Sequence, residues 1–577
     1  MRDVALFWPS SGFRPTGRRQ RDGYASHCAF KPNKASWASV REGKRPPRIP
    51  PRYAEEFGGY AREAAPLTTR DARHPGSDPA PERPHDGHAT IRIAMPAAGH
   101  EAIAIGANGR AGRAVYLHFA VGAAVLFLLS SLKYALFLST SHDLGFFDQA
   151  VYLISRLHTP VVSFSGSHVL GDHAAVILYA MAPLYRIWAD VHWLLAVQAV
   201  ALAVGVFPVH YLARDAGLDE SDSLTLAVIY LASPFLFNAN LFDFHPEVIA
   251  VPALLGAVLA ARRGNLLTFA ALVVVSLACK EIIGLTVLAL GLWLFVGERR
   301  RAAGAVAAML GFGWFLVATF WVIPHFAGHQ ASGLDRYSYL GHDIRSMAAN
   351  VVANPWLLGS RLFSLDTLWY LVRIAFPVAW ALRWGCFAPL TGAIPAVLLN
   401  VVAGYGGQRS LEFQYTLPIL PFLILTAIQS RSSGRSWLRS RRALLLWAGV
   451  SFLLLANFHA PVSRAFAALP TAGAMAEAVR LVDGPGGVLT TAEAAPHLTH
   501  RDTVVDTDSS APPTGLDAFD YVLLNVPRPG WRSDATFAAL LVKRVMEDRA
   551  FALRYSQDGV FLFARKKPWR GIQTSAS

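Results

Sequence analysis

The sequence predicts an all-α protein that crosses a membrane about eleven times and ends in a small α/β domain. Of its 577 residues, 53% are hydrophobic and only 16% are charged, whereas soluble domains carry about 25% charged residues. The charge deficit is concentrated in residues 114–458, which consist of apolar segments close to the roughly 20 residues that a membrane-crossing helix needs. These observations exclude a soluble globular enzyme and indicate a multi-spanning membrane protein.

Residues 1–94 differ from the rest of the chain because they are basic and rich in proline. They contain 12 of the 35 prolines and about half of the net charge of +14. Segments such as RPPRIPPR (45–52) cannot bury enough apolar surface to offset the loss of chain entropy on folding. We therefore expect a disordered tail, then a cytoplasmic lead-in over 95–113, with translation from Met95 as an alternative. No nucleic-acid partner is expected.

The apolar segments between residues 114 and 458 are joined by loops of two kinds. Some loops are rich in arginine, and the others contain acidic, histidine and aromatic motifs. Because Lys and Arg accumulate in cytoplasmic loops, eleven crossings from a cytoplasmic N-terminus place the arginine clusters inside. Residues 459–577 are then extracytoplasmic, and the protein is expected in the plasma (inner) membrane. The predicted segments are 114–138, 193–213, 222–241, 245–261, 265–279, 281–297, 303–324, 366–384, 386–404, 413–429 and 441–458.

Two stretches decide this topology. Residues 265–297 are apolar except for Lys280 and Glu281 in the middle, and one helix of that length would run about 50 Å, too long for a hydrocarbon core of about 30 Å. A tight hairpin with Lys280 and Glu281 at its outer tip keeps both arginine-flanked ends inside. Residues 171–190, which contain Pro183, are predicted to lie along the outer surface or within the outer leaflet without crossing.

The first outward loop contains the motif HDLGFFDQ, in which Asp143 and Asp148 lie five residues apart. One interpretation is structural. Asp143 would cap a helix that begins near Leu144, and Asp148 would lie in its early turns, where carboxylates suit the helix dipole. The other interpretation is a carboxylate pair beside a membrane-level cavity, with one member acting as a base or a metal ligand.

A second outward motif, FDFHPE, carries Asp243, His245 and Glu247 at the start of a later apolar segment. Proline and glutamate are common in the first turn of a helix, which explains only part of this motif. Three ionisable groups in such a short stretch also form a candidate second half of a site. A divalent cation, Mg²⁺ or Mn²⁺, is a candidate cofactor, and its candidate ligands are Asp143, Asp148 and His245.

Cationic and aromatic side chains add candidates for binding an anionic group. Lys280 and Glu281 either form an ion pair that closes their hairpin or belong to a site below the membrane surface, where ionisable groups are usually functional. Arg373 lies within an apolar segment, and it either snorkels outward or faces a cavity and binds a lipid phosphate. The remaining candidates in outward loops are Arg336, Tyr337 and Arg409.

Alternating strand and helix patterns predict a small α/β layer in residues 459–577. Its two neighbouring histidines, His497 and His500, are expected to pack or to lie at the surface rather than to bind a ligand. The predicted strands are 486–491, 503–506 and 520–526, the predicted helices are 472–482 and 533–548, and residues 551–565 are predicted to form a hairpin around 557–559.

Six short motifs follow one another along the chain: DLGFFDQ, FDFHPE, KE, DRYSYLG, PHLTHR and DYVLLN. In these motifs the chain resembles, over about residues 110–565, the bacterial predicted-membrane-protein family called domain of unknown function 2079. The resemblance implies a fold related to the GT-C glycosyltransferases, which are membrane enzymes that move sugars from polyprenyl-phosphate carriers on the outer face. In such enzymes an acidic residue just after the first span serves as base or metal ligand, and Asp143 and Asp148 match that position.

We therefore expect a membrane glycosyltransferase that takes a sugar from a polyprenyl-phosphate carrier on the extracytoplasmic side. Asp143 or Asp148 would deprotonate the acceptor hydroxyl, Glu281 is a further catalytic candidate, and the cations would neutralise the departing phosphate. A membrane transporter or lipid flippase and an envelope scaffold or sensor are the alternatives. The first hypothesis predicts that five side chains converge around one cavity open to lipid and to water, namely those of Asp143, Asp148, Asp243, His245 and Glu281.

Overall fold

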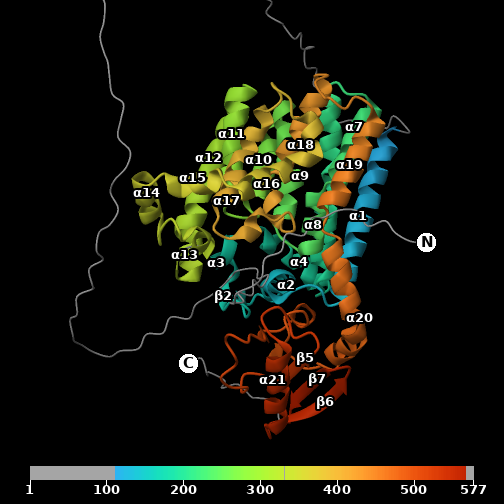
Figure 1. The fold of residues 1–577 in the computed structure, drawn as a ribbon, viewed down its shortest axis with the longest axis vertical. Coiled ribbons are helices and arrows are strands. Elements are labelled where there is room, and N and C mark those ends of the chain that lie inside the picture. The colour runs from blue at the N-terminus through green and yellow to red at the C-terminus, as the bar shows by residue number, and fades with distance from the viewer. Residues whose placement is uncertain (1–110, 330–331, 567–577) are drawn as a thin grey trace, which may run out of the picture. The chain divides into compact units, whose positions relative to one another are not determined.

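The computed structural model describes residues 111–329 and 332–566. The predicted disordered tail and most of the predicted lead-in, residues 95–110, lie outside the described residues. The described chain is mainly helical and ends in a small domain built around a β-sheet, which confirms the predicted fold class (Figure 1).

Each of the eleven predicted apolar segments coincides with a helix or with two consecutive helices. Short loops separate most of these helices. The helices end at the charged and Gly/Pro-rich stretches between the apolar segments. The helices are α1 (Ala111–Ala135), α5 (His192–Val204), α6 (Val206–Asp215), α7 (Glu220–Leu231), α8 (Pro234–Phe242), α9 (Glu247–Arg262), α10 (Leu266–Leu277), α11 (Ile283–Leu292), α12 (Arg301–Val317), α16 (Leu365–Ala375), α17 (Ile394–Val402), α18 (Leu420–Ser432) and α19 (Arg441–Leu455).

Four helical stretches in the described chain are long and apolar enough to cross a membrane by themselves, and two bent helix pairs raise this number to six. The four stretches are Arg113–Ala135, His192–Asp215, Glu220–Phe242 and Arg301–Ala327. The other predicted crossings correspond to shorter helices such as α9, α10 and α11. The count of about eleven crossings depends on these short helices and stays a prediction.

The arginine-rich loops meet at one end of the helix bundle, which we call the arginine end. Arg262 Nη2 lies 2.6 Å from Glu298 Oε1, and Arg263 Nε lies 2.8 Å from Asp215 Oδ2, so the ends of α6, α9 and α11 are tied together. Arg431, at the end of α18, pairs with Asp222 of α7 at 3.1 Å. The opposite end, where α1 and α8 finish and α9 and α11 begin, is the tail end. The structure thus separates the two kinds of loop as the sequence predicts, and their orientation in the membrane stays a prediction.

The apolar stretch 265–297 is two helices, α10 and α11, with Lys280 and Glu281 in the turn between them, as predicted. Helix α12 lies against α11 so closely that a Cβ atom on Gly284 would approach the carbonyl oxygen of Gly311 to 2.6 Å. Because α11 and α12 approach so closely, apolar side chains of α12 lie beside the turn of Lys280 and Glu281 at the tail end.

Residues 171–190 form no single full-length helix. They belong to α3 (Val169–His173), a short 3₁₀ helix (Val176–Ala180) and α4 (Ala182–Ile187), with a left-handed break at Ala174 (φ 49°). The amide of Ile177 donates to the carbonyl of Ala278 at 2.9 Å, which places this segment against the end of α10.

Helix α2 (Phe146–Ser155) and the hairpin of β1 (Val161–Val162) and β2 (Ser167–His168) precede this segment. Helix α13 (Ile323–Ala327) is the last part of the helical stretch Arg301–Ala327, and the long loop after it contains α14 (Ile344–Ala353) and α15 (Trp356–Leu362).

The tail domain has a five-stranded sheet in the order β4-β3-β5-β7-β6. Strand β3 is parallel to β4 and β5, and β7 is antiparallel to β5 and β6. The predicted hairpin is present, and its turn places Asp558 (φ 49°) and Gly559 (φ 75°) in left-handed conformations. The predicted helix 472–482 is the second half of a longer helix. The elements are α20 (His459–Arg480), β3 (Val488–Thr490), β4 (Val504–Asp506), β5 (Tyr521–Asn525), α21 (Ala535–Glu547), β6 (Phe551–Gln557) and β7 (Val560–Arg565).

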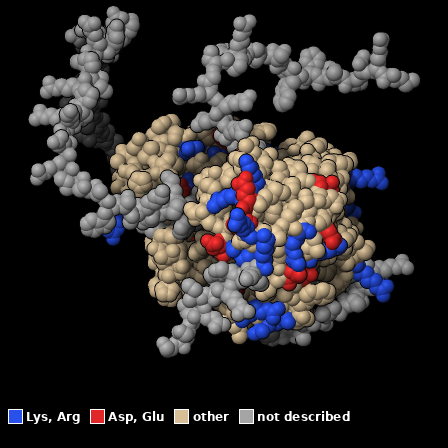
Figure 2. All heavy atoms as spheres, turned by 90° about the horizontal axis from the view of Figure 1, so that it is seen from below, with Lys and Arg blue, Asp and Glu red and all other residues tan. Residues whose placement is uncertain are grey.

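The tail domain contacts the bundle along strand β4 and through α20 and the sheet. Ser141, just after α1, donates through Oγ to Asp506 Oδ2 at the end of β4 (3.1 Å), and Ser163 Oγ donates to the carbonyl of Val504 at 2.7 Å. Phe137 at the end of α1 is buried together with residues of α20 and of the sheet. Viewed from the tail-domain side, acidic and basic side chains are interspersed among uncharged residues (Figure 2). The loop that follows α1 is therefore held between two domains.

Candidate functional site

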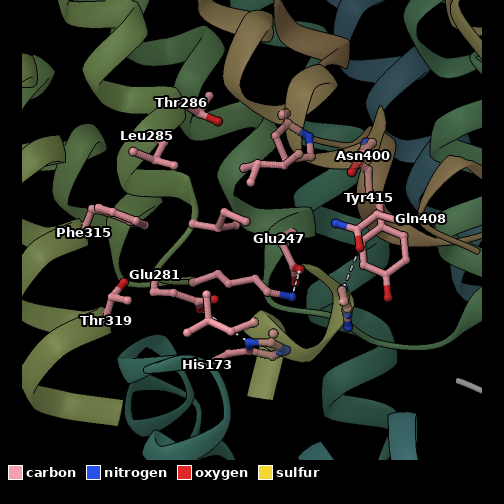
Figure 3. A pocket seen from close by; sticks show the side chains of 18 of the residues that line it. His173, Glu247, Glu281, Leu285, Thr286, Phe315, Thr319, Asn400, Gln408 and Tyr415 are labelled. Atoms are coloured by element: carbon pink, nitrogen blue, oxygen red, sulfur yellow. Dashed lines mark hydrogen bonds and ion pairs between the residues drawn. The ribbon is translucent and has the colours of Figure 1, made fainter. Parts of the chain in front are cut away.

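A cavity of about 160 Å³ lies at the tail end of the bundle, beside the turn between α10 and α11 (Figure 3). Figure 3 shows Glu247, Glu281 and His173 at one side of this first cavity, and Leu285 and Thr286 at the other. The first cavity therefore has a charged part and an apolar part. The apolar lining consists of Ile282, Leu285, Phe315, Leu334, Ile344, Ala396, Leu399 and Pro418.

The charged part of the first cavity is built from the start of α9, the end of α3 and the turn between α10 and α11. Lys280 Nζ donates to Glu247 Oε1 at 2.7 Å, and both side chains are buried. His173 Nδ1 lies 3.4 Å from Glu281 Oε2, and the amide of Glu281 donates to the carbonyl of His173 at 3.3 Å. Two acid–base pairs thus line this wall side by side.

Arg336 and Tyr337 also line the first cavity. The Arg336 guanidinium lies 5.1 Å from the ring centroid of Tyr415 and donates to Gln408 Oε1 at 3.2 Å. The Tyr337 hydroxyl donates to the carbonyl of Leu399 at 3.1 Å. A second cation therefore borders the same space as Lys280.

Asp143 and Asp243 border a second and larger cavity, of about 690 Å³, between the bundle and the tail domain. Lys133 Nζ, near the end of α1, lies 2.6 Å from Asp243 Oδ1. The Thr140 hydroxyl donates to Asp143 Oδ2 at 2.9 Å, and the Thr140 amide donates to Asp243 Oδ2 at 3.2 Å. The two carboxylates therefore flank one threonine.

His245 connects the two groups of charged residues. Its Nε2 atom lies 3.5 Å from Asp143 Oδ1, and its ring stacks on Phe242 at a centroid distance of 5.2 Å. Glu247, two residues further along the chain, belongs to the first cavity. The structure thus brings Asp143, Asp243 and His245 together and places them next to the Lys280–Glu247 pair.

Asp148 points elsewhere. It is fully buried, and it accepts hydrogen bonds from the Tyr185 hydroxyl (2.5 Å) and from the Thr499 hydroxyl of the tail domain. His500 Nε2 lies 3.1 Å from Asp148 Oδ2. Burial lowers the pKa of His500, but the charge and hydrogen bond of Asp148 outweigh this effect, and the net result is a raised pKa. Asp148 therefore holds the tail domain to the bundle and is not part of the Asp143 group.

Neither Arg373 nor Arg409 lines the first cavity. Arg409 Nη1 donates to the carbonyls of Val401 (3.1 Å) and Ala403 (2.9 Å), where α17 ends. Arg373 Nη2 donates to the carbonyl of Arg409 at 3.0 Å. Both guanidinium groups thus bond to backbone carbonyls in the last turn of α17 or in the chain that follows it.

The predicted divalent-cation site has no matching set of ligands in the described chain. In residues 111–329 and 332–566, no group of three or more His, Cys, Asp and Glu side chains is arranged to hold an ion. Of its candidate ligands, Asp143 and His245 lie together, whereas Asp148 is bonded to Tyr185 and Thr499. The residues present therefore do not fit a three-ligand metal centre.

Sequence reasoning misses Lys133 and Glu493, which line the second cavity. Lys133 has a detectable signal, because an ionisable residue near the end of an otherwise apolar span is a candidate functional residue. Glu493 lies in the segment AEAAPHLTHR, in which the two histidines are the more obvious candidates for a site. His497 packs as expected: its ring stacks on Tyr134 at 3.9 Å, and burial lowers its pKa to about 3.

The motifs that form these two cavities lie within a recognised family. The chain matches the model of the predicted membrane protein family DUF2079 over residues 133–562. It belongs to this family. No curated protein matches the sequence of this DUF2079 member.

Among solved structures, this DUF2079 protein is similar to ArnT from Cupriavidus metallidurans bound to undecaprenyl phosphate. The TM-score is 0.48 at 13% identity, and the match covers 79% of this chain and 98% of that chain. The apo state of the same ArnT matches with a TM-score of 0.41 at 14% identity, covering 77% of this chain and 98% of that chain.

Proposed function

We propose that this protein transfers a sugar from a polyprenyl-phosphate carrier to a hydroxyl acceptor, at the tail end of the bundle and on the extracytoplasmic side. The observation that carries the proposal is the first cavity, where an apolar wall adjoins Lys280 and Arg336. A polyprenyl phosphate is amphipathic and needs both kinds of surface. Arginine and lysine are the side chains that bind phosphate oxygens in proteins.

In the proposed reaction, the acceptor oxygen attacks the anomeric carbon of the donor sugar. The acceptor proton moves to the Asp143 carboxylate, and the bond from the anomeric carbon to the phosphate oxygen breaks. The phosphate keeps the electron pair, and Lys280 and Arg336 neutralise its charge. Asp143 borders the second cavity and the cations border the first, so the proposal assigns the acceptor to the second cavity and the donor to the first.

The buried acid–base pairs also favour a second candidate function, an ion-coupled transporter. Asp143–His245, Glu247–Lys280 and His173–Glu281 form pairs in which a proton could move. However, these pairs belong to the tail end, whereas a transport path must continue to the arginine end. A transporter predicts proton flux across proteoliposomes that Glu247→Gln abolishes, and the transferase predicts no such flux.

The direct test is donor turnover in proteoliposomes that contain polyprenyl-phosphate-linked sugars. We expect the wild type to release polyprenyl phosphate, and Asp143→Asn to lower the rate by about 10²–10⁴-fold, the usual contribution of a general base. Asp215→Asn, at the arginine end, is the matched control and should leave the rate unchanged. Equal rates for the wild type and Asp143→Asn, or no wild-type release from any carrier of a sugar panel, would contradict the proposal.

A further inference from the structure

The second cavity extends beyond Asp143 and Asp243 into the tail domain. Its volume of about 690 Å³ lies within the range of roughly 300–1,000 Å³ that small-molecule sites occupy. The tail domain contributes Glu493, Arg528, Gly530 and Trp531 from its loops, and α20 contributes Ala460, Pro461 and Arg464. The space is therefore a joint feature of the two domains.

The four loop residues of this lining come from the loops that follow β3 and β5. These two strands are parallel neighbours, and Glu493 and Trp531 follow their carboxyl ends. In open α/β sheets, ligands bind in the crevice outside the carboxyl ends of parallel strands. Gly530 makes the second loop possible, because its φ of +102° disfavours other residues and a Cβ there would approach Glu493 Oε2 to 3.1 Å.

Two polar atoms of this lining are buried and make no hydrogen bond with another described residue. They are Glu493 Oε2 and Trp531 Nε1. Buried polar atoms in proteins nearly always have a partner, so an acceptor and a donor in one cavity indicate that a bound molecule supplies both. A hydroxyl group can do so, because it donates and accepts.

The charges in the second cavity largely cancel. Lys133 pairs with Asp243 at 2.6 Å, and Arg464 pairs with Glu412 at 3.2 Å. Burial raises the pKa of Glu493 to about 7, against the opposing charge of Arg528, so this carboxyl group carries only part of a charge at neutral pH. These features suit an uncharged, hydroxyl-rich ligand better than an anion.

We infer that the second cavity binds the acceptor as a carbohydrate, with the Trp531 ring against the apolar face of a sugar and Glu493 hydrogen-bonded to its hydroxyl groups. An aromatic ring supplies a large apolar contact and a polar edge at once. The assignment of this carbohydrate as the acceptor rests on the proposed function, because Asp143 borders the same cavity. Carbohydrate binding itself does not depend on that function.

The test is saturation-transfer difference NMR on the full-length protein in nanodiscs, without any polyprenyl donor. The probes are N-acetylglucosamine, methyl glucoside and cellobiose, and inorganic phosphate is the competitor. We expect Trp531→Ala and Glu493→Gln to weaken binding of at least one sugar by about tenfold. Trp531→Phe, which keeps an apolar ring, should retain most of the binding. The matched controls are Trp384→Ala and Glu477→Gln, whose side chains lie outside the cavity.

Absence of a sugar signal in the folded wild type, or an undiminished signal in both Trp531→Ala and Glu493→Gln, would overturn the inference. Displacement of every sugar by millimolar phosphate would also overturn it, since the cavity would then be an anion site. Donor turnover separates the two proposals. Normal turnover in Trp531→Ala overturns the acceptor assignment but leaves the proposed function intact, whereas sugar binding without any turnover supports the cavity and contradicts the function.

Discussion

The two ends of the helix bundle use the same kinds of charged residue in different surroundings. At the arginine end, the side chains of Arg263 and Asp215 are 49% and 35% exposed. At the tail end, Lys280 and Glu247 are only 8% and 5% exposed. Exposed ion pairs contribute little to stability, whereas buried charges are costly and are typical of functional sites. The exposed Arg263–Asp215 pair therefore links two loops at the arginine end, and chemistry is expected at the tail end.

A second contrast lies within one motif. Asp143 borders a cavity and contacts His245, whereas Asp148, five residues later, is fully buried against Tyr185 and the tail domain. Two carboxylates of the same loop thus serve different purposes, one beside a space that a ligand can enter and one as a link between domains.

The largest effect on stability is expected when one partner of the buried pair at the tail end is removed. Lys280→Met leaves Glu247 as an unpaired buried charge, which should lower the free energy of unfolding by about 3–5 kcal/mol. The double variant Lys280→Met, Glu247→Gln should recover most of this loss. Thermal unfolding in nanodiscs measures the stability of the single and the double variant. A single variant as stable as the wild type would show that the Lys280–Glu247 pair is solvated like the Arg263–Asp215 pair.

A smaller effect is expected at the link between domains. Asp148→Asn removes the charge that raises the pKa of His500, and it should weaken tail-domain attachment by about 1–3 kcal/mol. Because the folded pKa of His500 is raised, its contribution is fully present below the unfolded value of 6.5 and is lost as the pH rises through the folded value. Hydrogen exchange of residues 495–506 at several pH values measures this contribution, and identical profiles for wild type and variant would contradict the assigned role.

The titration of Glu493 should make the free energy of unfolding depend on pH, and this change should be smaller than the one at the link between domains. Its folded pKa of about 7 exceeds the ordinary 4.5, so folding favours the protonated form. Stability from this group is complete below pH 4.5 and falls as the pH rises through 7. Glu493→Gln should remove this fall and raise the free energy of unfolding at pH 8 by about 1–2 kcal/mol. Unfolding at pH 5 and pH 8 tests the sign, and a larger loss at pH 5 would refute it.

The smallest effect is expected at the arginine end. Arg263→Ala breaks a half-exposed pair with Asp215, and such pairs contribute less than about 1 kcal/mol. The melting temperature should hardly change, and the remaining difference should shrink further in high salt. A loss of unfolding free energy as large as that of Lys280→Met would contradict the difference in ion-pair strength between the two ends.

Much of the fold follows from the sequence because segment length and charge are local signals. The apolar segments, the break at Lys280 and Glu281, and the turn at Asp558 and Gly559 all depend on neighbouring residues. The separation of the loops is predictable for a similar reason. Arginine runs and acidic motifs alternate along the chain, so each kind gathers at one end of an up-and-down bundle.

The side-chain directions are less predictable. A spacing of five residues turns two side chains about 140° apart around a helix, which argues against a joint site for Asp143 and Asp148. The partners of Asp148, however, are Tyr185 of α4 and Thr499 of the tail domain, which lie far from it in the sequence. Arg373 and Arg409 bond carbonyls in the chain after α17, and no local pattern encodes that irregular backbone. Glu493 reaches the second cavity through domain packing, which sequence spacing cannot show.

The most direct test of the contrast between the two ends is native mass spectrometry of the protein with a polyprenyl phosphate. The wild type and Arg263→Ala should each retain one lipid phosphate. The double variant Lys280→Met, Glu247→Gln should retain clearly less of it, because one of the two cations that border the cavity is gone and only Arg336 remains. Equal retention by all three proteins would contradict the assignment of the tail end as the lipid-phosphate site.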